Sequence, residues 1–219
     1  MESTINGFEK DIADHELKII VDSGVNRILE FRNKNGSSNQ FFNVMQVKNR
    51  ICFTGDMGEF VFTNHNDDML AWFHDNTSLT YIAEKCRTGG TRKFDEDSAK
   101  ESIKMMVDDF CNDHLYDYDE SGCDDGDDDN FEVALARWQQ DLYDEVIDEL
   151  DFESDEAFHR SAYDLSVRVN DSIKFEIDVC DGIGCMEYTG HFKWCVAAMN
   201  KVAELYFSSK EEIESHGND

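Results

Sequence analysis

The sequence has no proline in 219 residues, and its 20 Lys and Arg residues are outnumbered by 49 Asp and Glu residues. The formal net charge at pH 7 is therefore −29. Affinity for phosphate backbones comes from Lys and Arg side chains that displace counterions, so this composition argues against direct binding to DNA, RNA or an anionic membrane. It predicts attraction to basic surfaces instead.

Long hydrophobic runs are also missing. No stretch approaches the roughly 18 apolar residues of a membrane span, and no apolar segment follows a basic start in the first 20 residues. The seven cysteines form no Cys-x-x-Cys pair, so in the absence of a secretion signal we expect reduced thiols. These features predict a protein of the cytoplasm.

Recognisable catalytic motifs are absent as well. The sequence contains no Walker loop and no His-Glu-x-x-His motif, and Gly182-Ile183-Gly184 lacks the third glycine of a dinucleotide-binding turn. The seven histidines are scattered along the chain. We therefore expect neither an enzyme nor a bound cofactor.

Apolar residues make up 40% of the chain and include 16 Phe, which is enough for a folded core. Residues 16–63 contain short segments rich in β-branched and aromatic residues between Gly, Asn and Ser turns, a pattern that predicts an antiparallel β-meander. The string Gly55-Asp56-Met57-Gly58 predicts a tight hairpin, because glycine supplies the positive φ of such turns.

Helical periodicity begins after residue 64. We predict a short helix at Met69–Phe73, a helix capped by Ser78 and ended by Gly89-Gly90, and a longer helix opened by Asp95. These helices are expected to cover one face of the sheet.

An acidic stretch follows at residues 117–129, and we expect it to form a loop. The next helix has an apolar stripe at Phe131, Leu135, Trp138, Leu142, Val146 and Leu150. A helix near 154–165, a strand at 173–179 and a final helix at 192–207 complete an α+β fold. The expected division is residues 1–110, an insertion-like acidic segment at 111–166, and residues 167–219, which complete the first domain.

Carboxylates dominate the acidic stretch and the helix after it. Acids three or four residues apart on a helix lie roughly 5–6 Å from each other, which is of the order of the phosphate spacing along a nucleic-acid strand. The candidate partner-binding residues are Asp124, Asp125, Asp127, Asp128, Asp129, Asp141, Asp144, Glu145, Asp148 and Glu149. The alternative is that these acids only keep the chain solvated.

Two weaker patterns suggest metal sites. Asp117, Asp119, Ser121 and Asp128 occupy calcium-loop positions, although position 12 of that loop is normally Glu. Cys180, Cys185, His191 and Cys195 offer four zinc-type ligands, although their spacing matches no standard module. Cys180 and Cys195 are alternatively small buried hydrophobes.

One set of motifs carries a resemblance. Gly55-Asp56-Met57-Gly58 precedes Phe60-Val61-Phe62 and is followed by Asp68-Met69, Trp72-Phe73, Tyr81 and Ala83-Glu84-Lys85. With Glu187-Tyr188-Thr189 and Phe192-Lys193-Trp194-Cys195, this string resembles a family of acidic proteins encoded by phages and prophages. The likeness covers residues 16–110 and 185–207, and Val47-Lys48-Asn49 replaces the family's Trp-Pro-Gly.

The resemblance implies a phage accessory protein that acts inside the infected bacterium. Small acidic phage proteins of this kind are often inhibitors of host defence, such as restriction enzymes, CRISPR effectors or the Gabija system. The leading hypothesis is a non-enzymatic inhibitor that mimics DNA and binds a basic, nucleic-acid-binding host protein. The alternative is an accessory enzyme or metal-binding protein with its site at Gly55–Gly58 or at the Cys/His cluster. A homo-oligomer formed through an edge strand or through an apolar patch is a further expectation, although the net charge disfavours self-association.

Overall fold

The computed structural model describes residues 7–75, 78–114, 128–170, 173–177 and 184–216. Within these ranges the chain has an α+β fold made of two units. The first unit comprises Met1–Arg92 and Tyr188–Asp219, and the second comprises Lys93–Glu187. The chain passes from the first unit to the second in β7 (Arg92–Phe94) and returns in β10 (Met186–Tyr188), and these two strands pair with each other.

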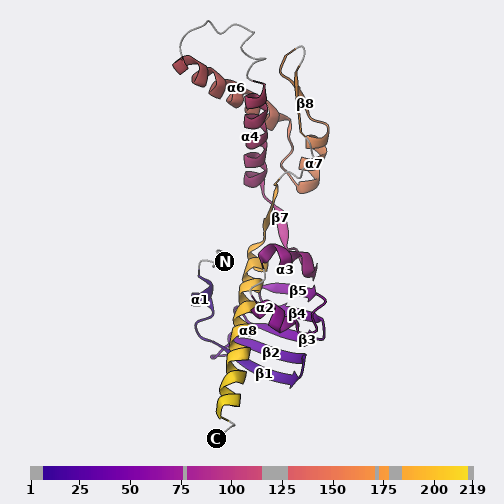
Figure 1. Ribbon diagram of the computed structural model, residues 1–219, viewed down its shortest axis with the longest axis vertical. Coiled ribbons are helices and arrows are strands. Elements are labelled where there is room, and N and C mark those ends of the chain that lie inside the picture. Colours follow the sequence, from indigo (N-terminus) through magenta and orange to yellow (C-terminus); the bar gives the residue numbers. More distant parts are fainter. Residues whose placement is uncertain (1–6, 76–77, 115–127, 171–172, 178–183, 217–219) are drawn as a thin grey trace. The chain divides into compact units, whose positions relative to one another are not determined.

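A six-stranded antiparallel sheet forms the centre of the first unit (Figure 1). Its strand order follows the chain order, so the meander predicted from residues 16–63 is confirmed. The strands are β1 (His15–Ser23), β2 (Asn26–Asn33), β3 (Phe42–Val47), β4 (Arg50–Gly55), β5 (Gly58–Thr63) and β6 (Cys86–Thr88).

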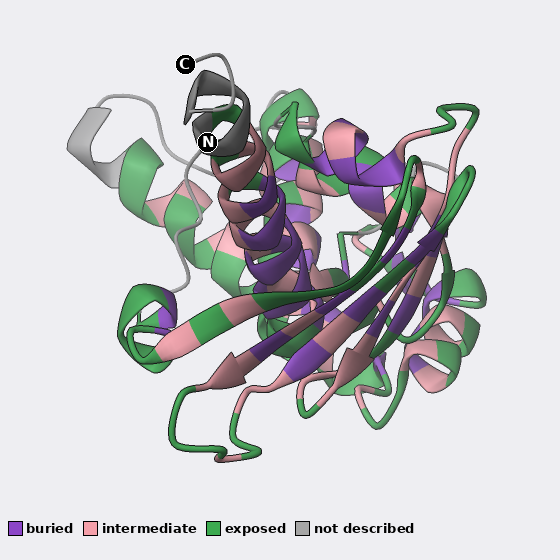
Figure 2. Ribbon diagram, turned by 90° about the horizontal axis from the view of Figure 1, so that it is seen from below, coloured by how far each residue is buried: buried purple, intermediate pink, exposed green. Residues whose placement is uncertain are grey.

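Every second side chain of β2 to β5 is buried, and Figure 2 shows these positions recurring along the strands. The buried row is made of Leu29, Phe31, Phe42, Val44, Ile51, Phe53, Phe60 and Phe62. Alternation of this kind is typical of a sheet that is covered on one face. The cover is formed by α2 (Met69–His74), α3 (Leu79–Lys85) and α8 (Gly190–His216), whose apolar residues share the same core.

Trp194 anchors α8 to the centre of the sheet. Its ring meets Phe42 edge-on with 5.7 Å between centroids, and Phe42 is stacked on Phe53 at 4.7 Å. Phe8, from the short helix α1 (Phe8–Asp11), contacts Trp194 edge-on at 5.4 Å. Edge-to-face and offset contacts of this kind add to the free energy of burying aromatic surface.

Two polar residues, Arg27 and Gln46, are also buried on this face of the sheet. Arg27 precedes Leu29 by two positions on β2 and is only 7% exposed. Its guanidinium donates two hydrogen bonds to the Asp68 carboxylate, at 2.5 and 2.7 Å, and one to the Tyr206 hydroxyl at 3.0 Å. Tyr206 in turn donates to Asp22 on β1. The network thus connects β1, β2, α2 and α8.

Asp68 also caps α2, because its carboxylate accepts the backbone N–H groups of Leu70 and Ala71. Burial favours the neutral acid, but the hydrogen bonds from Arg27, Ala71 and Gln46 outweigh it and lower the pKa of Asp68 below its ordinary value. Asp68 is therefore ionised at neutral pH and balances the buried guanidinium.

The predicted hairpin between β4 and β5 is confirmed, with Asp56 and Met57 as its two turn residues. Gly55 has no room for a side chain, since a Cβ there would collide with the backbone of Phe41 and Phe42. Gly58 has a φ of +110°, which residues with a side chain rarely adopt.

The second unit has its own apolar core. Its helices are α4 (Glu96–Asp113), α6 (Asp128–Glu149) and α7 (Asp155–Tyr163), and its hairpin pairs β8 (Ser166–Arg168) with β9 (Lys174–Glu176). The fully buried side chains include Ala99, Ile103, Val107, Cys111, Val146, Phe158 and Ala162. The apolar stripe predicted for α6 supplies Leu142, Val146 and Leu150 to this core.

Several boundaries differ from the sequence predictions. The helix capped by Ser78 ends at Lys85 rather than at Gly89-Gly90, because Cys86–Thr88 pairs with β5 as β6. Helix α4 does not cover the sheet, because its apolar face packs against α6 in the second core. The second unit consequently spans 93–187, wider than the expected insertion at 111–166, and includes β8 and β9. Helix α8 is longer than the expected 192–207.

None of the helices in the described part of the chain is long and apolar enough to cross a membrane.

Replacing Asp68 by Asn should lower the free energy of unfolding of the first unit by about 3–5 kcal/mol, because the guanidinium of Arg27 would remain buried without a counter-charge. Urea unfolding can be followed by the fluorescence of Trp72 and Trp194 in a Trp138→Phe background, so that only the first unit reports. The matched control is Asp67→Asn, which removes the same charge from an exposed neighbour and should change stability by less than about 0.5 kcal/mol. Equal stabilities of the two variants would contradict this role of Asp68.

Candidate functional site

Negative charge is concentrated in the second unit. Residues 93–187 contain 31 Asp and Glu residues and 7 Lys and Arg residues, a formal net charge of −24. The remaining residues contain 18 acidic and 13 basic residues, a net charge of −5. The second unit therefore carries most of the charge that distinguishes this chain, and any electrostatic recognition is expected to involve it.

Five of the predicted partner-binding residues form one face of α6. Asp141, Asp144, Glu145, Asp148 and Glu149 are all exposed, whereas Leu142 and Val146 on the same helix are buried. At 3.6 residues per turn the five acids fall within an arc of about 140° beside the buried stripe. Each has another of the five three or four residues away. We call these five residues the α6 acidic face.

The stability of the helix does not account for the two C-terminal residues of the α6 acidic face, whereas Asp141 pairs with Arg137 and Asp144 accepts a hydrogen bond from Gln140 on the same helix. Asp148 and Glu149 lie in the last turn of α6, which contains no basic residue. The negative end of the helix dipole disfavours acids there by about 0.3–1 kcal/mol each. The first turn of α4, by contrast, holds Glu96 and Asp97 behind the Asp95 cap, where acids stabilise the helix.

An open hollow adjoins the α6 acidic face. Glu145 and Glu149 line it from α6, Asp164 lines it from the segment that joins α7 to β8, and Arg168 lines it from β8. Three carboxylates and one guanidinium give this hollow a net negative lining. It is therefore suited to a Lys or Arg side chain from a partner.

The other predicted acids lie at the beginning of α6 or outside the described residues. Asp128 and Asp129 are the first two residues of α6. Asp124, Asp125 and Asp127 fall outside the described residues, as do the calcium-loop candidates Asp117, Asp119 and Ser121.

The predicted Cys/His cluster is divided between the two units. Cys185 is buried in the second unit, whereas His191 and Cys195 belong to α8 in the first. Burial raises the pKa of Cys195 well above its ordinary value, so that Cys195 packs as a neutral thiol. Cys180 lies outside the described residues. The chain changes units between residues 187 and 188, so the four candidates do not belong to one unit.

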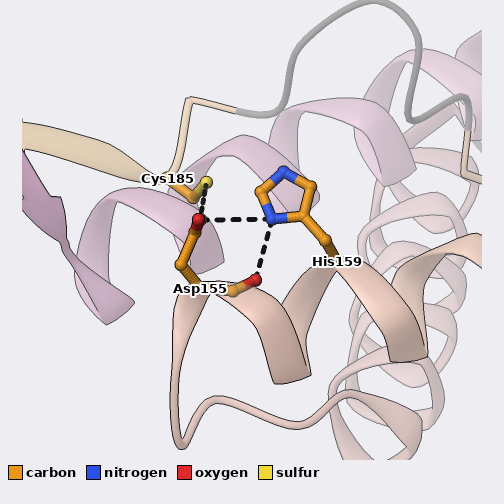
Figure 3. Close-up of side chains that lie close together, drawn as sticks. All are labelled: Asp155, His159 and Cys185. Carbon is orange, nitrogen blue, oxygen red and sulfur yellow. Dashed lines mark hydrogen bonds and ion pairs between the residues drawn. The ribbon is translucent and has the colours of Figure 1, made fainter.

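Cys185 lies beside Asp155 and His159 of α7 (Figure 3). Its Sγ lies 3.6 Å from Asp155 Oδ1, and that oxygen is 3.2 Å from His159 Nδ1. Burial and the Asp155 carboxylate raise the pKa of Cys185, so its thiol is protonated at neutral pH. The sequence analysis did not identify this cluster, although Asp155 and His159 are four residues apart on one helix, a spacing that brings side chains together.

The motif residues of the resemblance occupy structural positions in the first unit. The carboxylate of Asp56 accepts the backbone N–H of Gln40 at 2.9 Å and so joins the hairpin to the segment before β3. Glu84 and Lys85 end α3, and the Lys85 ammonium lies 4.5 Å from the centre of the Tyr81 ring. These contacts explain why the motif uses such residues without invoking chemistry at the hairpin.

One apolar surface bears on the expected homo-oligomer. Ile20, Val21, Ile28, Met45 and Val47 are exposed on β1 to β3, and β1 forms an edge of the described sheet. Self-association through this surface stays a prediction.

Comparisons of the chain with models of known families, with curated proteins and with solved structures found no match. Its function is therefore inferred from its residues and their geometry.

Removing the charges of the α6 acidic face should stabilise α6. The five substitutions are Asp141→Asn, Asp144→Asn, Glu145→Gln, Asp148→Asn and Glu149→Gln. Loss of five like-charge pairs should add about 1–2 kcal/mol, which slows hydrogen exchange of the α6 amides roughly 5- to 30-fold at low salt. The difference should shrink at about 1 M salt, where surface charges are screened.

The control variant carries an equal number of amide substitutions on exposed residues of the first unit: Asp11→Asn, Asp14→Asn, Glu16→Gln, Glu59→Gln and Asp75→Asn. It should leave exchange in α6 unchanged. If the α6 variant exchanges faster than the wild type, the acids stabilise their own helix and need no external partner to explain them.

Proposed function

We propose that this protein is a phage-encoded inhibitor of a bacterial defence system. It acts as a DNA mimic, and the second unit binds a basic, nucleic-acid-binding surface of the host protein. Binding sequesters that surface and requires no chemical step. The site of action is the host cytoplasm, as the resemblance to acidic phage proteins implies.

The observation that carries this proposal is the α6 acidic face. Its five carboxylates are exposed and contiguous, and two of them lie in the last turn of the helix. Asp148 and Glu149 are unfavourable for the isolated helix at these positions, so they are more readily explained by a positively charged partner than by stability. A general need for solvation would be met as well by acids at helix N-termini, where they stabilise.

The charge of the second unit favours a partner with a cationic groove. A net charge of −24 attracts a basic protein over distances set by the Debye length, which is about 8–10 Å at physiological ionic strength. Such steering raises association rates and makes them sensitive to salt. Channels that bind nucleic acid are lined with Lys and Arg, and they are the surfaces for which duplex DNA would compete with this protein.

The first unit serves as the scaffold in this proposal. The residues that carry the resemblance are turn and core residues, such as Gly55, Phe60, Phe62 and Trp194, together with Asp68. The resemblance therefore concerns mainly the fold of the first unit. Target choice is assigned to the second unit, where the exposed acids are concentrated.

The experiment is affinity capture with the tagged full chain from lysates of bacteria that carry restriction, CRISPR or Gabija systems. We expect recovery of a nucleic-acid-binding effector that is released both by duplex DNA and by raised salt. The variant with the neutralised α6 acidic face should recover at least about tenfold less effector, because steering by the field of the second unit is weakened.

The first-unit amide variant has the same total charge as the α6 variant but keeps the α6 acidic face, so it should recover as much effector as the wild type. Equal recovery by both variants would show that net charge alone, and not the α6 acidic face, drives capture. An effector that is retained at high salt and is not displaced by DNA would contradict DNA mimicry.

A further inference from the structure

We propose that the second unit binds one divalent transition-metal ion of the zinc type through Asp155, His159 and Cys185. Among the described residues, these three side chains place an oxygen, a nitrogen and a sulfur atom within 4.8 Å of one another. The proposal is independent of the DNA-mimic function.

Two of the three distances between the ligand atoms are close to those expected around a single ion, and all three lie within 4.8 Å. A tetrahedral zinc ion with bonds of about 2.0–2.3 Å holds its ligand atoms about 3.4–3.6 Å apart. Asp155 Oδ1 lies 3.6 Å from Cys185 Sγ and 3.2 Å from His159 Nδ1. Figure 3 shows Asp155 Oδ1 next to both Cys185 Sγ and His159 Nδ1. Only small side-chain adjustments would be needed to admit an ion.

The donor set selects the class of metal. A thiolate and an imidazole are ligands for zinc and similar transition metals, whereas calcium and magnesium prefer oxygen ligands alone. Three protein ligands leave one tetrahedral position for water or another ligand. In the metal-free protein His159 Nδ1 lies 2.9 Å from the backbone carbonyl oxygen of Asp155. Because a carbonyl oxygen can only accept a hydrogen bond, Nδ1 is assigned the ring proton, which a bound metal ion would replace.

The three ligands are held on anchored backbone. Asp155 and His159 lie on α7, whose N-terminus is capped by the Ser154 hydroxyl. Cys185 is only 1% exposed, and its carbonyl accepts the N–H of Asp95 at the start of α4. A site built on anchored elements loses little conformational entropy when it binds a ligand.

An ion at this position would tie α7 to the segment that leads into β10. Such a link closes a loop of about 30 residues and adds two positive charges to a unit with a net charge of −24. Because the ion binds the folded unit and not the unfolded chain, it should stabilise the second unit as its concentration rises above the dissociation constant.

The test is titration of the reduced, metal-free full chain with Co²⁺, followed by Zn²⁺. We expect one equivalent of Co²⁺ to produce a thiolate-to-cobalt charge-transfer band in the near ultraviolet, and Zn²⁺ to abolish it. Cys185→Ala should remove the band, and His159→Gln should weaken Co²⁺ binding at least about tenfold. The matched control is Cys111→Ala, which removes another buried cysteine from the same core and should keep the band.

His159→Gln keeps the test valid if Cys185→Ala fails to fold, because His159 lies partly exposed on the helix surface. A band of unchanged intensity in Cys185→Ala would place the bound metal at another thiol and overturn the proposal. The same conclusion would follow if the wild type showed no saturable binding of Co²⁺ at one equivalent. Either result would leave the capture experiment on the α6 acidic face unaffected.

Discussion

Repulsion between carboxylates is the constraint that the second unit has to satisfy. Thirty-one acids share 95 residues with seven Lys and Arg residues, and the fold must hold them together around a core of modest size. Among the residues that the structure describes, most acids of this unit are exposed, while Leu142, Val146 and Phe158 turn inward. Some acids stabilise their helices, as at the start of α4, but Asp148 and Glu149 of the α6 acidic face oppose the dipole of their own helix. A partner that supplies positive charge would relieve this repulsion, as would a bound divalent cation.

Repulsion between carboxylates does not dominate the first unit. Its charge is close to balanced, and its most buried ionic group, Arg27, is satisfied by Asp68 and Tyr206. That network joins β1, β2, α2 and α8, so the sheet and its helical cover are linked by directed bonds as well as by aromatic packing. A rigid unit of this kind is suited to serve as a scaffold, while the surface that we assign to recognition lies in the second unit.

Local patterns predicted much of this fold, and long-range pairings account for most of what was missed. Alternation in residues 16–63, helical periodicity after residue 64 and the helix starts at Ser78 and Asp95 were sufficient to predict β1 to β5, α2 and the starts of α3 and α4. The sequence does not reveal that α4 packs on α6, because its apolar face is equally compatible with a sheet. Contacts between distant segments are also what the sequence could not predict at the two candidate sites. The α6 acidic face follows from helical periodicity, whereas the meeting of Cys185 with Asp155 and His159 depends on two segments 30 residues apart.

Carboxyl-specific footprinting of the chain, alone and bound to its captured effector, tests the central claim most directly. A carbodiimide couples an amine to accessible Asp and Glu side chains, and mass spectrometry reports the extent of modification at each one. The account predicts that Asp141, Asp144, Glu145, Asp148 and Glu149 become protected in the complex, while exposed acids of the first unit, such as Glu16 and Glu59, react as in the free chain. Protection confined to the first unit, with the α6 acidic face fully reactive, would contradict it.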